Sequence, residues 1–108
     1  MADIVDKPVD PYTSETIVVG VGSAAVGFAT TNVHPSTGLF RGQRARVAYV
    51  GNETTSVRFH VTGTVPAAAC GMILADGAYL MLDSPTAVEN FLTVCTGGTA
   101  TLYITYFA

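Results

Sequence analysis

The chain has 108 residues, a length that fits one domain with a single hydrophobic core and leaves no room for a separate catalytic domain. Only 12% of the residues are charged while 49% are hydrophobic, and the charged fraction is about half of that usual in soluble proteins. The formal net charge of −3 argues against a nucleic-acid partner. Because charged surface keeps proteins apart in solution, this composition predicts a surface that is largely covered in an assembly.

Residues 1–14 are predicted to form an extended N-terminal arm. Charged side chains crowd this segment, and its two prolines exclude a helix interior. The apolar side chains that alternate with the charges are predicted to order against a neighbouring protein, for example by adding a strand to an exposed sheet edge. These residues are Ile4, Val5, Val9 and Tyr12. Residues 15–108 are predicted to form one β domain.

From Glu15 onward, β-branched and aromatic residues recur with a period of two between glycine-containing breaks. This pattern predicts eight short strands, at residues 15–21, 27–31, 44–50, 55–61, 72–74, 79–83, 90–95 and 99–107. Gly51-Asn52 is predicted to form a hairpin turn, and Ser84-Pro85 to start at most one helical turn. The predicted fold is an all-β, single-domain antiparallel β-sandwich, jelly-roll-like, preceded by the arm.

Two strands show which side chains face the core. In the strand at residues 55–61, Val57, Phe59 and Val61 share one face, while polar residues share the other. In the last strand, Leu102, Ile104 and Tyr106 alternate with a second set that also contains aromatic side chains. That second set, Tyr103, Thr105 and Phe107, is predicted to meet a partner, with Tyr49 and Tyr79 as further aromatic anchors. The alternative is that these side chains belong to the core.

The segment from Gly20 to Ala25 matches G-x-G-x-x-A directly after an apolar strand, as a dinucleotide-binding turn does. Such a fold needs a crossover helix next, but Gly27, Pro35 and several β-branched residues disfavour one. It also needs an acidic residue about 20 positions later, and the sequence has none between Glu15 and Glu53. The segment is therefore interpreted as a glycine-rich connection, and no cofactor is predicted.

No catalytic residue and no metal site are predicted. His34, His60, Cys70 and Cys95 lie in four separate segments without metal-ligand spacing. The two cysteines are expected to be buried free thiols, with a disulfide as the alternative. Acidic residues stand where the basic region of a secretory signal belongs, and no segment is apolar enough to span a membrane, so synthesis in the cytoplasm is predicted.

Arg41, Arg44 and Arg46 form the single basic cluster of the sequence. Three arginines within six residues are suited to contact phosphate or the carboxylates of a partner. Because the chain is acidic overall, the cluster is interpreted as a solvated or interfacial strand edge. These arginines therefore join the predicted partner-contacting residues.

Three segments carry a resemblance to a known group of proteins. They are residues 57–66 (VRFHVTGTVP), residues 71–80 (GMILADGAYL) and residues 96–107 (TGGTATLYITYF). Over residues 45–107 the chain resembles small structural proteins of tailed bacteriophages. The resemblance implies a compact β-sandwich or jelly-roll-like domain, often oligomeric, used as capsid cement or as a head-to-tail or tail component. It supplies no catalytic residues.

The predicted function is that of a non-enzymatic virion protein, a capsid decoration (cement) protein that stabilises the head by bridging capsid subunits. Its expected partners are the major capsid protein or other virion proteins, and further copies of itself in a dimer or trimer. It would be made in the cytoplasm of the bacterial host and located on the capsid surface, without nucleic-acid or membrane partners.

Two alternatives remain from the sequence. The first is a phage tail, adhesion or head–tail connector component that binds glycans through exposed tyrosines, although the absence of tryptophan disfavours it. The second is a small enzyme with a buried site, which would need a metal cluster, a carboxylate pair or an activated nucleophile that the sequence does not display.

Overall fold

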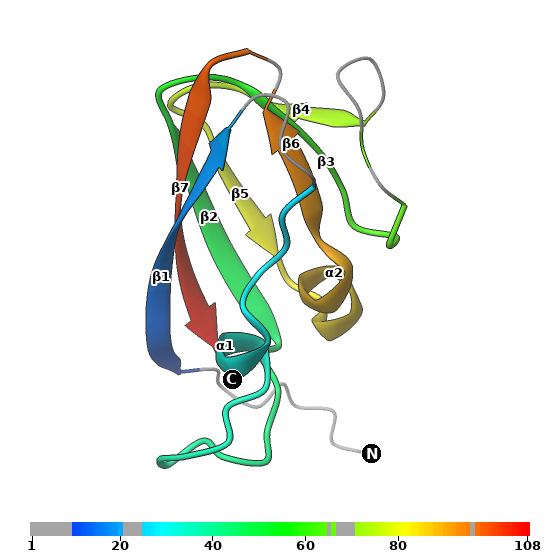
Figure 1. Ribbon diagram of the computed structural model, residues 1–108. Helices are drawn as coiled ribbons and strands as arrows, with labels where there is room; N and C mark the ends of the chain where they lie inside the picture. Colours follow the sequence, from blue (N-terminus) through cyan, green and yellow to red (C-terminus); the bar gives the residue numbers. More distant parts are fainter. Residues whose placement is uncertain (1–9, 21–24, 65, 67–70, 96) are drawn as a thin grey trace.

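The computed structural model describes residues 10–20, 25–64, 66, 71–95 and 97–108, which form two antiparallel sheets packed face to face (Figure 1). In spatial order, the four-stranded sheet contains β1 (Pro11–Gly20), β7 (Thr99–Phe107), β2 (Val47–Glu53) and β5 (Tyr79–Leu82). The three-stranded sheet contains β4 (Met72–Leu74), β3 (Val57–His60) and β6 (Leu92–Cys95). The predicted all-β antiparallel sandwich is confirmed.

Strand β7 lies in the interior of the larger sheet, between β1 and β2. Its alternation is the one predicted: Leu102, Ile104 and Tyr106 are buried in the core, whereas Tyr103 is exposed on the opposite face. A strand paired on both sides and buried on one face needs this period-two pattern, because successive side chains point to opposite faces. The predicted bounds of β7 are also confirmed.

An aromatic cluster fills the core between the sheets. Phe91 stacks on Phe28 with ring centroids 4.5 Å apart, and on Phe59 of β3 with centroids 5.7 Å apart. Phe28 and Tyr106 of β7 form a T-shaped pair with ring centroids 5.4 Å apart. These rings connect the two sheets through direct contact, and the predicted inward face of β3 is confirmed by the burial of Val57 and Phe59.

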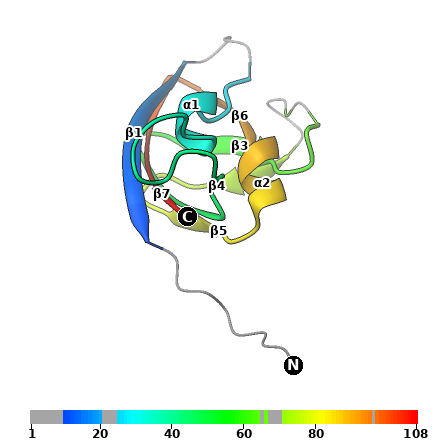
Figure 2. The ribbon, with the colours of Figure 1, turned by 90° about the horizontal axis from the view of Figure 1, so that it is seen from below.

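Two short helices lie toward the lower end of the sandwich in Figure 1, the end from which Figure 2 is viewed. Helix α2 (Pro85–Asn90) begins as predicted, with Pro85 in its first turn and the Ser84 hydroxyl accepting the Ala87 N–H. Helix α1 (Thr30–Val33) was not predicted. Val33 is buried in the core, so tertiary packing outweighs the β propensity of the threonines here.

The strand predicted at residues 27–31 is wrong. Residues 25–29 contain a single β-bridge, between Val26 and Thr93 of β6, before α1 begins. Gly27 explains the close approach, because a Cβ atom at this position would lie 2.9 Å from the Phe91 carbonyl oxygen. The segment therefore covers the side of the sandwich next to β6 instead of adding a strand of its own.

The hairpin turn predicted at Gly51-Asn52 is also wrong, because β2 runs through both residues to Glu53. The Asn52 side chain is buried, and its Nδ2 donates to the carbonyl oxygens of Thr55 at 2.8 Å and Leu74 at 2.9 Å. A buried amide thus connects β2 to β4 of the other sheet. The chain turns after Glu53, where Thr54 has a positive φ of 91°.

Strand β1 begins at Pro11, so the predicted arm boundary at residue 14 is too late. Residues 11–14 belong to the sheet, and Asp10 exchanges two backbone hydrogen bonds of 3.0 Å with Ala108. The part of the arm that precedes this pairing, residues 1–9, lies outside the described residues.

The strands predicted at 55–61, 79–83 and 90–95 differ from β3, β5 and β6 by at most two residues at either end.

Candidate functional site: the outer face of the four-stranded sheet

The side of the four-stranded sheet that faces away from the core, here called the outer face, carries large apolar side chains in contact with solvent. Their exposed fractions range from 41% to 68%. They come from all four strands: Val18 on β1, Tyr49 on β2, Tyr79 and Met81 on β5, and Tyr103 on β7. Monomeric proteins seldom leave such a group of neighbours uncovered, so this face is the candidate interaction surface.

The pairing of the strands arranges these side chains in rows. Gly51 of β2 lies between Tyr103 of β7 and Tyr79 of β5, which are its two register partners. In the next row, Tyr49 lies between Thr105 and Met81. Tyr49 and Tyr79 stack with ring centroids 5.5 Å apart and planes 7° apart. The sheet thus holds the aromatic rings in fixed positions on a rigid backbone.

A hollow of about 390 Å³ opens on this face, where β2 ends and β5 begins. It is lined by Tyr49, Gly51, Asn52, Glu53, Gly77, Tyr79, Tyr103 and Thr105. Gly51 makes the hollow possible, because a Cβ atom there would lie 3.0 Å from the ring of Tyr79. With no side chain at the centre of the row, the tyrosines on both sides become the walls of the hollow.

Among the described residues that line the hollow, the charged one is the acidic Glu53, and Asp76 lies in the adjoining turn. The Tyr103 hydroxyl donates to the Glu53 carboxylate at 3.2 Å, and the charge of Glu53 together with this hydrogen bond raises the pKa of Tyr103. Asp76, in the turn before β5, accepts the Thr54 N–H at 3.0 Å. The four strands contain no lysine or arginine, and their other acid, Glu15, contacts the buried Tyr106. The hollow therefore favours a cationic or hydrogen-bond-donating group.

The residues predicted to contact a partner from β7 lie together on the outer face. Tyr103 is exposed, and Thr105 and Phe107 are half-buried on the same side of the strand. The structure places Tyr49 and Tyr79 beside them, as described above. Sequence alternation therefore located this surface, because each strand turns alternate side chains toward it.

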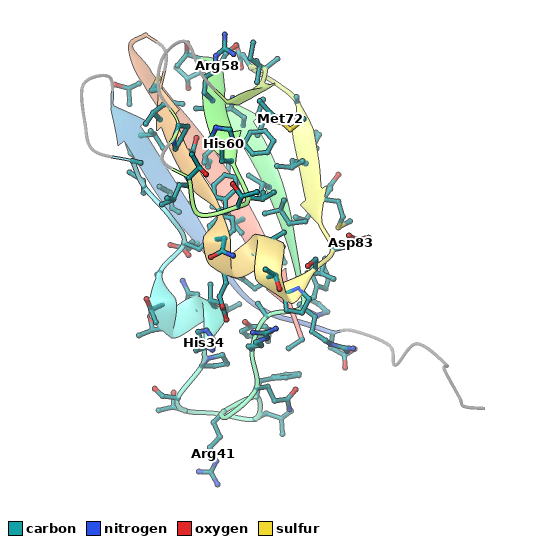
Figure 3. All side chains as sticks on the ribbon, turned by 90° about the vertical axis from the view of Figure 1, so that its right-hand side faces the viewer. His34, Arg41, Arg58, His60, Met72 and Asp83 are labelled. Atoms are coloured by element: carbon teal, nitrogen blue, oxygen red, sulfur yellow. The ribbon has the colours of Figure 1, made fainter. Side chains whose placement is uncertain are left out.

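The three arginines of the predicted basic cluster do not form one patch. Arg41 lies at the tip of a loop that projects beyond the sheets (Figure 3). Arg44 binds Glu89 of α2 at 3.1 Å, and the same carboxylate contacts His34 Nε2 at 3.0 Å. The backbone N–H of Arg46 donates to the Phe107 carbonyl at 2.9 Å, and Arg46 has a further interaction within the structure. The cluster is thus divided among a loop tip, a helix contact and a strand end.

The predicted contact residues of the arm are only partly described. Ile4, Val5 and Val9 lie outside the described residues. Tyr12 belongs to β1, where its hydroxyl donates to the Asn32 carbonyl and its ring lies 5.3 Å from that of Phe40. These contacts hold Tyr12 within the domain and connect β1 to α1 and the projecting loop.

The histidines and the cysteine that the structure describes do not form a metal-binding cluster. His34 and His60 lie at separate places (Figure 3), and the described residues contain no group of three or more His, Cys, Asp or Glu placed to hold a metal ion. Cys95 is buried and free, as predicted, whereas Cys70 lies outside the described residues. Residues 21–24 of the glycine-rich motif are likewise outside them. None of the described helices is long and apolar enough to span a membrane.

Four residues of the outer face were missed by the sequence analysis: Val18, Gly51, Glu53 and Met81. Period two in β5 would have found Met81, two positions after Tyr79. The same period in β2 would have placed Gly51 and Glu53 beside Tyr49, but interpreting Gly51-Asn52 as a turn ended the strand too early.

Comparison with known proteins adds no family to this description. No protein-family model matches the chain, and no curated protein matches it.

Proposed function

We propose that this chain is a non-enzymatic structural protein of a tailed-phage virion, a capsid decoration protein that attaches to neighbouring head subunits through its outer face. The observation that supports this proposal is the group of five large apolar side chains exposed on one face of a rigid sheet. The sequence resemblance to phage structural proteins supplies the setting. A binding subunit needs such a surface and no catalytic group.

The composition of the outer face suits protein binding. Aromatic side chains and methionine are enriched at the centres of protein interfaces, where charged residues are depleted. A large apolar side chain that becomes fully buried contributes about 1.5–3 kcal/mol. Since strand pairing holds the backbone in place before binding, the backbone loses little conformational entropy when a partner covers this face.

A decoration protein stabilises a shell by joining subunits that would otherwise separate. A copy that contacts two neighbours gains from multivalency, because the second contact forms at a high effective concentration. The low charged fraction of the chain fits this role, because a surface with few charged side chains is better suited to contact with another protein than to exposure to solvent.

Replacing the apolar residues at both flanks of the outer face tests the proposal. The double variant Val18→Ser with Met81→Ser is expected to bind capsids that lack the protein at least about tenfold more weakly, because it removes two exposed apolar contacts. Binding is measured as capsid occupancy against protein concentration. Both positions lie outside the hollow, and both side chains are more than half exposed, so the fold is retained.

The matched control is Met72→Ser with Ile73→Ser. These residues have the same chemistry and exposures of 65% and 58%, but they lie on β4 of the other sheet. The control is expected to bind like the unaltered protein. Equal binding by both double variants and the unaltered protein would refute attachment through the outer face.

The arm is tested by a separate deletion. Because residues 11–14 belong to β1, removing residues 1–14 would damage the sheet, whereas removing residues 1–9 leaves every described strand intact. The shorter deletion is expected to keep the thermal unfolding midpoint and to lower capsid occupancy, since Ile4, Val5 and Val9 would no longer order against a neighbour. Unchanged occupancy would show that the arm has no part in attachment.

A second candidate function is glycan binding by a tail or adhesion component. It is favoured by one observation, the hollow whose tyrosine rings and Glu53 carboxylate offer a stacking surface beside a hydrogen-bond acceptor. A glycan array separates the two candidates: a decoration protein binds capsids and no glycan, and a tail adhesin binds a glycan and no capsid.

A further inference from the structure

The hollow on the outer face has the chemistry of a site for a guanidinium group. Tyr49, Tyr79 and Tyr103 present their rings to it, and the Glu53 carboxylate lies at the Tyr103 hydroxyl. Aromatic rings attract cations through their negatively charged faces, and arginine also stacks on such rings and pairs with carboxylates. An occupant that satisfies the rings and the acid together is an arginine side chain.

The projecting loop at the other end of the domain offers such a side chain. The loop, residues 35–43, is closed by hydrogen bonds from the Gly42 N–H to the Pro35 carbonyl at 3.1 Å and from the Gln43 N–H to the Phe40 carbonyl at 3.1 Å. Its tip carries Leu39, which is 89% exposed, and the exposed Arg41. The loop thus holds an apolar and a cationic side chain outside the domain.

Arg41 differs from the other arginines of the chain. Arg44 is paired with Glu89, Arg58 donates to the Gly71 carbonyl at 2.9 Å, and Arg46 has a partner within the fold. Within the described parts of the chain, Arg41 is the arginine whose side chain makes no ion pair or hydrogen bond, and Figure 3 shows it extending away from the domain. Its guanidinium group is therefore available to bind another molecule.

We propose that the projecting loop of one copy docks in the hollow of a second copy. Arg41 of the first copy lies against the tyrosine rings and pairs with Glu53 of the second, and Leu39 packs beside it on the exposed ring of Tyr79. The charges are complementary, because the strands around the hollow carry no basic residue, while residues 16–52 carry no acidic one. This contact goes beyond attachment to a capsid, since it joins identical subunits.

The positions of the two surfaces limit the kind of assembly. The hollow lies where β2 ends at Glu53, whereas the loop precedes β2 at the lower end of the domain in Figure 1, so a copy cannot fill its own hollow. Two antiparallel copies that each place their loop in the other's hollow form a two-fold dimer. Docking in one direction forms a closed ring, such as a trimer, or an open chain. Val18 and Met81 lie outside the hollow and remain available for the capsid.

Mixing two defective proteins tests this contact. A loop variant, Leu39→Ser with Arg41→Ala, keeps its hollow, and a hollow variant, Glu53→Gln with Tyr79→Ser, keeps its loop. Sedimentation velocity of the unaltered protein is expected to show association that increases with concentration. Each variant alone is expected to stay monomeric, with association at least about tenfold weaker. An equimolar mixture is expected to form one-to-one dimers and nothing larger, because one intact contact remains.

Arg44→Ala is the control, since this arginine is bound to Glu89 of its own chain, and it is expected to associate like the unaltered protein. The proposal is overturned if the unaltered protein stays monomeric at millimolar concentration. It is equally overturned if either variant associates normally, or if the mixture contains monomers alone. Capsid occupancy is measured separately, so the attachment proposal can fail or succeed independently of this contact.

Discussion

Replacing Phe91 with alanine is expected to lower the free energy of unfolding by about 3–5 kcal/mol, the usual range for a buried phenylalanine. Phe91 is 1% exposed and stacks on both Phe28 and Phe59. It lies between α2 and β6, within the aromatic cluster that connects the two sheets, so its removal leaves a cavity in the core. The loss is measured by urea unfolding followed by circular dichroism.

The matched substitution is Leu39→Ala, at an apolar residue that is 89% exposed. It is expected to change the free energy of unfolding by no more than about 0.5 kcal/mol, as is usual for surface positions. A Phe91→Ala protein as stable as the Leu39→Ala protein would contradict the central place of Phe91 in the core.

The sequence predicted those elements whose environment is determined by local alternation. Strand β7 has a buried face of Leu102, Ile104 and Tyr106, and its bounds were predicted correctly. The start of α2 was predicted from Ser84-Pro85, because an N-cap and a proline in the first turn act within a few residues, although the six-residue helix is longer than the single turn predicted. In both cases the signal and the structure that it produces lie in the same short segment.

Elements that depend on distant contacts were not predicted. Glycine and asparagine favour turns, yet in β2 Gly51 makes room for the Tyr79 ring and Asn52 binds carbonyl groups of the opposite sheet. The β-branched residues near Thr30 form a helix because Val33 reaches the core. Each outcome is decided by a partner far along the chain, and local propensity contains no information about that partner.

The candidate site was predicted in part for the same reason. Alternation in β7 identified Tyr103, Thr105 and Phe107, but the hollow depends on β7, β2 and β5 being adjacent in that order. Strand order is not readable from spacing. The arginines show that neighbours in sequence can have separate surroundings. Arg44 binds Glu89 of α2, whereas Arg41 lies on the projecting loop, and the sequence does not reveal this difference.

The second large effect is expected from a partly buried hydrogen bond between β1 and β7. The hydroxyl of Tyr106, a fully buried residue, donates to the Glu15 carboxylate, which also accepts the Ala29 N–H at 3.2 Å. Replacing Tyr106 with phenylalanine keeps the ring but removes a donor to a charged group. The free energy of unfolding near pH 7 is expected to fall by about 1.5–3 kcal/mol, the usual contribution of such a bond.

The same tyrosine makes stability depend on alkaline pH. Burial, followed by the hydrogen bond to Glu15 and its charge, raises the pKa of Tyr106 above the ordinary value of 10.0. Above pH 10 the unfolded chain therefore loses this proton while the folded protein keeps it, so stability falls as pH rises. Above pH 10, this one group lowers the free energy of unfolding by about 1.4 kcal/mol per pH unit. Below pH 10, its full contribution to stability is present.

Phenylalanine at position 106 cannot ionise, so the Tyr106→Phe protein lacks this slope. The stabilities of the two proteins are expected to differ most near pH 7 and to converge as the pH rises above 10, in urea titrations repeated at each pH. Tyr79→Phe is the control, because its ring is exposed, and its curve should follow that of the unaltered protein. If the curves of the unaltered and Tyr106→Phe proteins run parallel, the pKa of Tyr106 is the same in the folded and the unfolded chain, and the prediction is wrong.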